Sequence, residues 1–456
     1  MPADDGAIAT ATLLARYDGR APRYTSYPTA LHFTPETGAE DYRGWLGRLP
    51  AADPISVYLH VPFCRSLCWY CGCNTRVVRD PAIISKYVDF LEREFELVEA
   101  ALPGRLTAGA LHLGGGTPNT LSTDDLDRTF AHLRRMFRLD EAAEISVEID
   151  PAALSCDWVE AAARNGLTRA SLGVQDLSPA VQAAVNRIEP FETVRRAVGW
   201  LRAAGVASIN LDLMYGLPRQ GVAEVEATLD EVLTLRPERL ALFGYAHVPW
   251  ARAHQRLIND RELADAAGRL EQSEAAADRL LWEGYVRIGL DHYALPDDPL
   301  AQAHARGELR RNFQGYTADP HATLLAFGVS AIGQLPQGFV QNEAGEAAWR
   351  TALAKGRLPV KRGLAFTDDD RFRADIIERL MCDLAVDLAD ARRRHGRPVE
   401  SLAAEREALL PLQAAGLITL DDERVAMTPL GRPFLRTVAQ VFDARSAPDA
   451  AYSRVV

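Results

Sequence analysis

The sequence has no long apolar run and no excess of basic residues. None of its apolar stretches approaches the roughly 20 residues that a membrane-spanning helix requires. Lys and Arg number 51 against 62 Asp and Glu, which gives a formal net charge of −11. Because nucleic-acid binding draws most of its affinity from clustered Lys and Arg, this balance disfavours a nucleic-acid partner. We recognise no secretory leader and no membrane span, so we expect a cytoplasmic protein.

Cysteine is scarce, and its distribution is uneven. Of the six cysteines, four lie within ten residues: Cys64, Cys68, Cys71 and Cys73. Disulfides are an unsatisfactory explanation, because Cys71-Gly72-Cys73 is too tight for easy bridging. The clustered thiols are therefore expected to bind metal. The other two, Cys156 and Cys382, stand alone in helical patterns, and we expect both to be buried packing residues.

Two kinds of metal site fit clustered thiols. Structural zinc would take four thiolates, but it usually draws them as two separated Cys pairs, and no second pair follows here. An iron–sulfur cube held by Cys64, Cys68 and Cys71 has one iron without a protein ligand, where a small molecule can chelate. The pattern favours the cluster and leaves zinc as the alternative. The Cys-x3-Cys-x2-Cys loop resembles the radical S-adenosylmethionine (SAM) superfamily, in which that iron binds SAM.

Apolar strand patterns alternate with amphipathic helix patterns from residue 55 to about residue 250. The strands are expected at 55–61, 109–114, 143–149, 169–175, 208–214 and 239–246, with helices such as 82–101, 122–136 and 221–234 between them. Ser122 begins a capping sequence, and Gly166 and Gly205 are expected to follow helix ends. Six consecutive βα units predict a parallel sheet with right-handed crossovers.

Polar and glycine residues fall at the ends of these predicted strands, where parallel strands converge on one mouth. They comprise the cysteine loop, the Gly-rich turn 114–117, Glu148, Gln175, Asp212, Tyr215 and the segment 245–247. A carboxylate in an apolar strand is costly to bury without a partner, so Glu148 indicates either a functional role or a structural ion pair. The Gly-rich turn fits a ligand contact and a simple tight connection equally well.

Three segments are expected along the chain. Residues 1–53 form an N-terminal arm, in which Arg23-Tyr24-Thr25-Ser26-Tyr27-Pro28-Thr29 either wraps the surface or covers a pocket. Residues 54–365 form the barrel with a sheet extension, built from a helix at 260–284, a strand at 285–290 and an apolar run at 327–333. Residues 366–456 form a mainly helical domain.

The last segment has a winged-helix-like pattern. Helices are expected at 367–386, 400–415 and 429–442, with a hairpin formed by strands 417–420 and 425–427. DNA binding is one function of such modules, but Asp421, Asp422 and Glu423 would occupy the wing and repel phosphates. We therefore expect a packing or lid domain.

Several motifs together extend the resemblance over nearly the whole chain. They are the stretch 23–29, the Cys64–Cys73 loop with its fourth Cys, Gly-Gly-Gly-Thr-Pro at 114–118, Gly-Val-Gln-Asp at 173–176, Asp-Leu-Met-Tyr-Gly-Leu-Pro at 212–218, Tyr-Ala-His at 245–247 and Asn-Phe-Gln-Gly-Tyr at 312–316. In combination they resemble the oxygen-independent coproporphyrinogen III oxidases of haem biosynthesis. The resemblance implies an α/β fold with a partial (β/α)6 barrel around a [4Fe-4S] cluster on Cys64, Cys68 and Cys71.

The resemblance also implies two SAM sites. One SAM would meet Tyr58, Tyr70, Gly115, Glu148 and Ile332, and the second would meet Gly116, Thr117, Gln175, Arg187, Asp212 and Ala246. Tyr58, Glu148 and Cys73 are the implied catalytic residues, with Cys73 as a neighbouring or proton-donating thiol rather than a cluster ligand. Tyr70 departs from the Phe that is usual in the family, so its hydroxyl needs a partner if it is buried.

The implied reaction converts two propionates of coproporphyrinogen III to vinyl groups through a 5′-deoxyadenosyl radical. A one-electron donor such as flavodoxin or ferredoxin and a monomeric state are expected. The substrate's carboxylates need cations at the mouth, for which Arg23, Arg310 and Arg311 are candidates.

Two alternatives of different function remain. A related branch resembles haem-trafficking chaperones, but it lacks the fourth Cys and the Arg-Tyr-Thr-Ser-Tyr-Pro stretch that this chain carries. A second alternative is another radical SAM enzyme, such as a methyltransferase.

Overall fold

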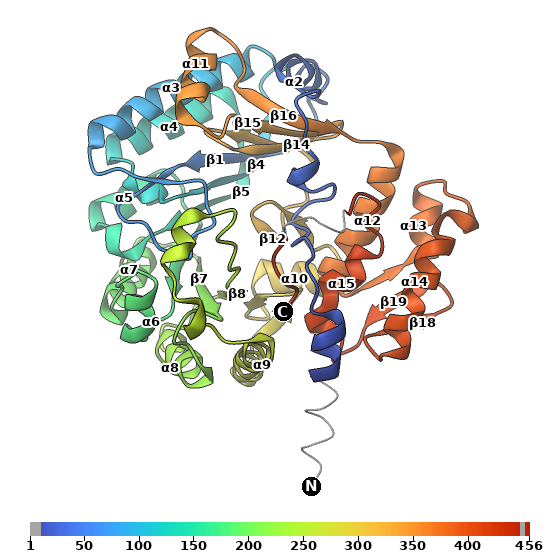
Figure 1. Ribbon diagram of the computed structural model, residues 1–456. Coiled ribbons are helices and arrows are strands. Elements are labelled where there is room, and N and C mark those ends of the chain that lie inside the picture. Colours follow the sequence, from blue (N-terminus) through green and yellow to red (C-terminus); the bar gives the residue numbers. More distant parts are fainter. Residues whose placement is uncertain (1–10, 447–451) are drawn as a thin grey trace.

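A twelve-stranded sheet is the centre of the protein, whose computed structural model describes residues 11–446 and 452–456. Six neighbouring strands are parallel and follow one another in chain order, as the sequence predicts: β1 (Ile55–Val61), β4 (Thr107–Gly115), β5 (Arg138–Ile149), β6 (Arg169–Gln175), β7 (Ser208–Tyr215) and β8 (Arg239–Gly244). They curve into a partial barrel (Figure 1). Within the described residues the two outermost strands of the sheet do not pair, so the barrel is open.

Additional strands extend both edges of the parallel sheet. Beside β1 lie β13 (Leu324–Phe327), which is parallel to it, and then the antiparallel strands β14 (Ile332–Leu335), β15 (Gly338–Asn342) and β16 (Val360–Ala365). Beside β8 lie the antiparallel strands β10 (His292–Ala294) and β9 (Val286–Ile288). The expected sheet extension is therefore present at both edges.

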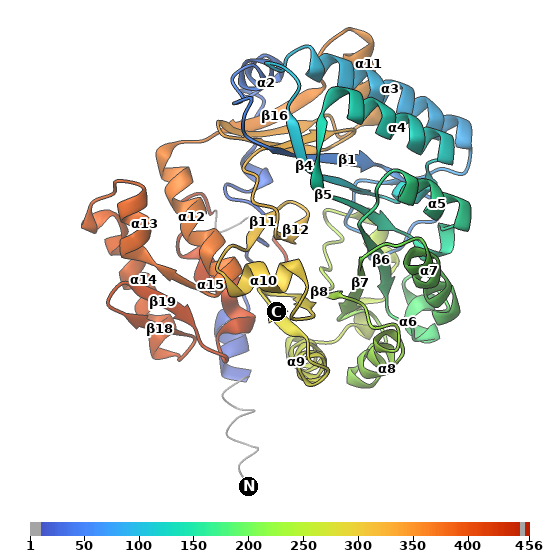
Figure 2. The same cartoon turned by 180° about the vertical axis from the view of Figure 1, so that it is seen from behind.

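Helices cover the outer face of the barrel, as Figures 1 and 2 show from opposite sides. They are α3 (Pro81–Glu99), α4 (Thr123–Met136), α5 (Cys156–Arg164), α6 (Pro179–Ala184), α7 (Phe191–Ala203), α8 (Val222–Leu233) and α9 (Ala266–Trp282). The hydroxyl of Ser122 accepts a hydrogen bond from Asp125 N–H and so caps α4. Gly166 and Gly205 follow α5 and α7 with φ of 87° and 85°, which confirms both helix ends.

The structure differs from the expected elements in three places. The apolar run 327–333 is two strands, because the chain turns at Gly328 (φ 97°) and Ser330 (φ 62°) between β13 and β14. The helix expected at 260–284 begins later, since Asp265 accepts from Gly268 N–H and caps α9 there. Short elements that the sequence analysis did not predict are α2 (Ala39–Leu46), α10 (Pro299–Ala305), α11 (Glu346–Ala354) and the hairpin of β11 (Arg310–Asn312) with β12 (Gly315–Thr317).

The two isolated cysteines have different environments. Cys382 is fully buried, as expected. The expectation that Cys156 is buried is wrong, because Cys156 is the first residue of α5 and its side chain is exposed. Its thiol lies 3.8 Å from Glu160 Oε1, one turn along the same helix.

The N-terminal segment packs on the C-terminal part of the chain. Residues 11–17 are helical, and Tyr17, Tyr24 and Tyr27 are buried in one hydrophobic cluster with α12 (Asp368–Asp383) and α15 (Leu435–Gln440). Figure 1 shows the two segments side by side. The Tyr24 hydroxyl donates a 3.0 Å hydrogen bond to Asp443 Oδ2. The segment is therefore anchored by its aromatic side chains and does not lie loosely on the surface.

The C-terminal region is mainly helical, as expected. It contains α12, α13 (Leu388–Arg394), α14 (Ala403–Ala414) and α15 with the antiparallel strands β17 (Ala385–Asp387), β18 (Ile418–Asp421) and β19 (Arg424–Met427). Glu423, at the β18–β19 turn, forms ion pairs with Arg392 and Arg406. The acidic turn is thus partly neutralised within the region itself. Among the described residues, no helix combines the length and apolarity needed to cross a bilayer.

A buried glutamate connects the edge of the barrel to two of its helices through hydrogen bonds. Glu94 on α3 is 1% exposed and accepts hydrogen bonds from Gly328 N–H, Asn342 Nδ2 and Trp349 Nε1 at 2.9, 2.6 and 2.9 Å. Burial raises the pKa of Glu94 to about 7, although these three bonds favour the ionised form. The contacts join α3, the β13–β14 turn, β15 and α11.

We expect Glu94→Ala to lower the free energy of unfolding by about 3 kcal/mol, because three buried donors lose their acceptor. The measurement is the urea midpoint of the far-ultraviolet circular dichroism. Glu96→Ala, at an exposed position on the same helix, is the matched control. Equal midpoints for the two variants would show that this network does not stabilise the fold.

Candidate functional site

The cysteine loop leaves the barrel directly after β1. Its first and last parts pair with each other, because β2 (Phe63–Cys64) and β3 (Arg76–Val77) form a short parallel ladder. This ladder closes the loop at its base. The thiols of Cys64, Cys68 and Cys71 therefore lie above the carboxyl-terminal ends of the barrel strands, where the sequence predicts the site.

Hydrogen bonds from three other segments hold the loop in place. Trp69 N–H donates to Val185 O at 2.9 Å, and Asn186 Nδ2 donates to Leu67 O at the same distance. Gln255 Nε2 donates to Tyr70 O, His254 Nε2 donates to Cys71 O, and His60 Nε2 donates to Asn74 O, at 2.9, 2.8 and 2.9 Å. The sequence analysis missed Asn186, His254 and Gln255, because Asn186 lies in a short connection and the other two lie in a single 3-10 turn (Ala253–Leu257), and neither carries a periodic signal.

Each of the three thiols has its own hydrogen-bond donor. Cys64 Sγ lies 3.1 Å from Thr75 Oγ1 and 3.4 Å from Thr117 Oγ1, and Cys68 Sγ lies 3.6 Å from Arg187 Nη1. Cys71 Sγ accepts from Cys73 N–H at 3.4 Å. These donors favour the thiolate, which is the form that binds iron.

The Cys71 thiol has a lowered pKa. Hydrogen bonds from Cys73, helped by the charges of His254 and Arg252, lower the pKa of Cys71 to about 6 against the opposing effect of burial. Burial raises the pKa of Cys64, and the charges on Cys71 and Cys68 add to this, against the hydrogen bonds from Thr117 and Thr75.

The donor set fits a [4Fe-4S] cluster. Three neighbouring thiols on one loop, with hydroxyl, guanidinium and amide donors around them, are the ligands and hydrogen bonds that such a cluster uses. In residues 11–446 and 452–456, no group of three or more His, Cys, Asp or Glu side chains is arranged to hold a single metal ion. The structure thus gives no support to the zinc alternative.

The glycine turn lies against the cysteine loop. A Cβ on Gly114 would lie 2.9 Å from the Glu148 carboxylate, and one on Gly115 (φ 118°) would lie 2.8 Å from the His60 ring. A Cβ on Gly116 would lie 2.5 Å from Thr75 Oγ1. All three positions therefore require glycine for close packing of β4, the loop and the site carboxylate.

Glu148 is held by two groups of β4 at the mouth. Its Oε2 accepts from Gly115 N–H at 2.9 Å, and its Oε1 lies 3.3 Å from His112 Nε2. Ser146 Oγ lies 2.7 Å from the other nitrogen of His112, which orients the ring. Burial alone would raise the pKa of Glu148, but the His112 hydrogen bond and charge and the Gly115 N–H outweigh it, so the pKa is lowered. Glu148 is thus an ionised acceptor.

Tyr58 lies beside Glu148 and is held by two histidines. Its ring stacks on His112 with centroids 5.7 Å apart, and its hydroxyl lies 3.0 Å from His60 Nδ1. Because His60 Nε2 carries a proton and donates it to the carbonyl oxygen of Asn74 as a hydrogen bond, His60 Nδ1 is free to accept a hydrogen bond from the Tyr58 hydroxyl. Burial, and then the charge of Glu148, raises the pKa of Tyr58 well above its usual value, which keeps the phenol protonated.

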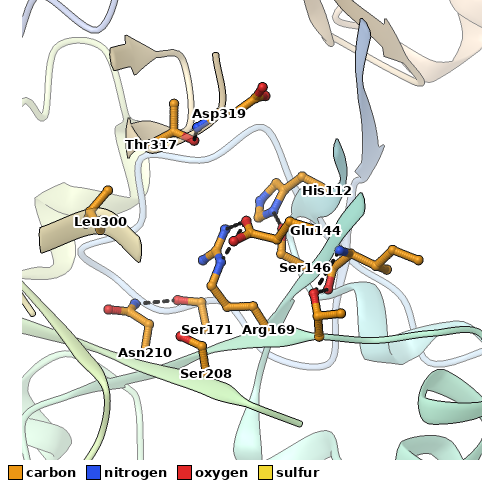
Figure 3. Close-up of polar contacts among 12 residues, drawn as sticks. His112, Glu144, Ser146, Arg169, Ser171, Ser208, Asn210, Leu300, Thr317 and Asp319 are labelled. Carbon is orange, nitrogen blue, oxygen red and sulfur yellow. Dashed lines mark hydrogen bonds and ion pairs between the residues drawn. The ribbon is translucent and has the colours of Figure 1, made fainter. Parts of the chain in front are cut away.

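Polar side chains continue down the inside of the barrel (Figure 3). They come from alternating positions of successive strands, and the register places His112 opposite Ser146 and Ser171 opposite Asn210. Asn210 Nδ2 donates to Ser171 Oγ at 2.7 Å. Arg169 Nε donates to Glu144 at 3.0 Å. The lumen is therefore hydrophilic, in contrast to the apolar interface between the sheet and its outer helices.

Asp212 is the second carboxylate of the lumen. It accepts from Ser171 Oγ at 2.9 Å and from Asn210 Nδ2 at 2.7 Å. Burial, followed by the negative charge of Glu148, raises the pKa of Asp212. The pKa values of the two carboxylates thus shift in opposite directions, because Glu148 has a histidine partner and Asp212 has two neutral partners, Ser171 and Asn210.

Tyr70, Gln175 and Arg187 link the cysteine loop to the opposite strands. The Tyr70 hydroxyl, for which the sequence required a partner, donates to Gln175 Oε1 at 3.1 Å. Arg187 Nη2 forms ion pairs with Asp150 and Glu189 at 3.2 and 3.0 Å, beside its contact with Cys68. Arg187 is therefore already paired with two carboxylates of the chain.

The remaining predicted residues divide into two groups. Thr117 and Cys73 contact the cluster thiols, and Ala246 follows β8 and accepts from Gln255 Nε2 at 3.2 Å. Ile332 packs instead beside Phe33 and Phe339 at the other sheet edge. Among the candidate cations, Arg310 pairs with Glu378 at 2.9 Å, whereas Arg23 and Arg311 line a separate cavity next to the mouth.

Comparison with known proteins agrees with this arrangement. Residues 58–232 match the family model of the radical SAM superfamily, and residues 366–434 match that of the HemN C-terminal domain. The chain is 48% identical over 429 residues to the oxygen-independent coproporphyrinogen III oxidase of Bradyrhizobium diazoefficiens, covering 94% of this chain and 95% of that protein. It is 37% identical over 448 residues to the Escherichia coli protein of the same name, covering 97% and 98%.

A solved structure gives the same result for the fold. Coproporphyrinogen III oxidase (HemN) from Escherichia coli, a radical SAM enzyme, matches with a TM-score of 0.89 and 36% sequence identity, covering 93% of this chain and 98% of that chain. The chain therefore belongs to the oxygen-independent coproporphyrinogen III oxidase family of the radical SAM superfamily.

Proposed function

We propose that this chain decarboxylates two propionate side chains of coproporphyrinogen III to vinyl groups, giving protoporphyrinogen IX. The observation that carries the proposal is the cysteine loop, whose three thiols lie over a hydrophilic lumen that contains two carboxylates of different acidity. The near full-length identity to enzymes of this name supports the choice of substrate.

The substrate chemistry defines what the site must do. Each propionate loses one hydrogen atom from its β-carbon, one CO2 and one electron, and a C=C bond forms between its two methylene carbons. When bound, a [4Fe-4S] cluster and SAM supply the hydrogen-atom acceptor for this step. The protein has to hold the reactants in place and to exclude water and oxygen.

The chain's own residues have separate roles in this proposal. Cys64, Cys68 and Cys71 hold the cluster, with the hydrogen bonds to their sulfurs positioning them. Glu148 is ionised and accepts hydrogen bonds from the ammonium or hydroxyl groups of SAM. Tyr58 keeps its proton and fixes the orientation of the His112 ring beside Glu148.

We infer two SAM sites at the mouth of the barrel. The first uses Tyr58, Tyr70, Gly115, Glu148 and Ile332, and the second uses Gly116, Thr117, Gln175, Arg187, Asp212 and Ala246. Two separate carboxylates, Glu148 and Asp212, support two sites, because each can accept from one molecule. We also infer a small one-electron donor such as flavodoxin or ferredoxin, a cytoplasmic location and a monomeric chain.

Turnover distinguishes this function from its alternatives. We expect the anaerobically reconstituted protein, given SAM, dithionite and coproporphyrinogen III, to release CO2 and 5′-deoxyadenosine in equal amounts. Stable haem binding with no CO2 would instead indicate a chaperone. Methylated substrate with S-adenosylhomocysteine would indicate a methyltransferase, and either result would contradict the proposal.

The cluster assignment has a direct chemical test. We expect Cys64→Ala to lose its iron, acid-labile sulfide and absorption near ~400 nm together, because two thiolates cannot hold the cube. Cys156→Ala is the matched control, since Cys156 is exposed on α5 away from the loop. Full iron and sulfide content in Cys64→Ala would remove Cys64 from the ligand set.

The acidity of Glu148 also generates a prediction. His112→Phe keeps a ring that can stack on Tyr58 but removes the hydrogen bond that lowers the pKa of Glu148, so this pKa should rise. If catalysis requires the ionised Glu148 carboxylate, kcat/KM falls when the pH drops below the pKa of Glu148. Because His112→Phe raises this pKa, the fall in kcat/KM at low pH should begin at a higher pH in the variant. An unchanged pH profile, as expected for the control His132→Phe on α4, would contradict the role of Glu148.

A further inference from the structure

A cavity rich in arginine adjoins the mouth of the barrel. Its volume is about 480 Å³, within the range of sites for small organic ligands. The ends of β7 and β8, the N-terminal segment, α9, α15 and residues 453–456 surround it. Gly244 and Ala246, which line it, belong to the strand end and loop that face the proposed second SAM site. The cavity therefore continues outward from the candidate active site.

Its charges do not balance. Seven arginines line the cavity, and three carboxylates accompany them: Asp265, Glu274 and Asp291. Each of these carboxylates is already engaged. Glu274 pairs with Arg287 at 3.2 Å, Asp291 lies 2.8 Å from His292 Nδ1, and Asp265 caps α9. An excess of positive charge thus faces the cavity.

Three of the arginines make hydrogen bonds to carbonyl groups but no ion pair within the described residues. Arg23 donates to Gly244 O at 2.7 Å, and Arg311 donates to the carbonyls of Tyr24 and Arg23 at 3.1 and 3.3 Å. Arg436, which is 5% exposed, donates to the carbonyl of Ala21. Arg311 Nη1 and Arg436 Nε are buried N–H groups without a partner. Such donors are costly unless an acceptor reaches them.

The acidity of these groups agrees with the charge imbalance. Burial, followed by the positive charge of Arg23, lowers the pKa of Arg436 to about 9. Burial likewise lowers the pKa of Arg23, and the charges of Arg311 and Arg269 act in the same direction, whereas the charge of Asp291 opposes them. An anion in the cavity would offset this repulsion.

The rim of the cavity is aromatic. Trp250 is 48% exposed, and the guanidinium of Arg20 lies 4.7 Å from the centre of its ring. Tyr215 and Tyr245 also line the cavity. A ligand that presents a flat apolar ring system together with carboxylates matches both features.

We propose that this cavity binds the two propionates that the substrate retains, and so presents the two reacting propionates to the barrel mouth. The inference rests on the proposed function, because it takes coproporphyrinogen III as the substrate. Arg23 and Arg311 bind the retained carboxylates, and Trp250 contacts the edge of the macrocycle between them. Since a tetrapyrrole with four propionates is larger than the cavity, one edge of the ring enters it and the opposite edge faces the mouth.

The test uses anaerobic holoenzyme and two ligands. Protoporphyrinogen IX carries only the two retained propionates, and its dimethyl ester carries none. We expect the wild-type protein to bind the diacid at least about tenfold more tightly than the ester, because the ester cannot pair with guanidinium groups. Equal affinity for the two ligands would overturn the inference without any variant.

Two variants assign the site to these residues. We expect Arg23→Gln and Arg311→Gln each to weaken diacid binding and to raise the KM for coproporphyrinogen III by about tenfold, with kcat at saturation and iron content unchanged. Arg311→Lys should restore part of the affinity. Arg195→Gln, at an exposed ion pair on α7, is the matched control. A wild-type KM in both variants would overturn the assignment.

The two proposals can fail separately. Tight diacid binding that depends on Arg23 and Arg311, with no CO2 released by the wild-type protein, would refute the decarboxylation and keep this binding site. Normal CO2 release with unchanged KM in the variants would refute the binding site and keep the decarboxylation.

Discussion

The hydrogen bonds that hold the cysteine loop are the constraint on which the site depends. Three thiols on one short loop would otherwise move with it, and a cluster needs them at fixed positions. The loop is fixed at its base by the β2–β3 ladder and along its length by Asn186, His254 and Gln255. These residues come from segments after β6 and β8, so the shape of the loop depends on parts of the barrel that are distant in sequence.

The barrel separates two environments on its two faces. Outside, apolar side chains pack the strands against α3, α4, α5, α7 and α8. Inside, alternating positions carry hydroxyl, imidazole, amide and carboxylate groups that bond to one another across neighbouring strands. This network shifts the pKa values of Glu148 and Asp212 in opposite directions. His112 lowers the pKa of Glu148, whereas burial beside neutral partners raises the pKa of Asp212. Two carboxylates in one lumen can therefore meet different groups.

The two ends of the described chain complete the mouth together. Residues 11–27 and the C-terminal helices share one hydrophobic cluster, and this contact places Arg23 and Arg436 in the same cavity. Neither segment could form the cavity alone, since its other walls come from β8, α9 and the hairpin residue Arg311. The C-terminal region is thus an integral part of the surface beside the site.

The sequence by itself determined the six parallel strands, the outer helices, the cysteine loop and the strand-end residues Glu148, Gln175 and Asp212, because hydrophobic periodicity and local motifs are encoded in neighbouring residues. Only the tertiary structure determined which side chains contact these site residues. His112 has the pattern of an ordinary strand residue, and only the register between β1, β4 and β5 brings it to Tyr58 and Glu148. Gln255 and the arginines of the cavity come from distant parts of the chain, among them the N-terminal segment, α9, β11 and α15, so only the fold brings them together. Cys156 was misassigned because an amphipathic pattern does not reveal which residue lies at a helix's exposed first position.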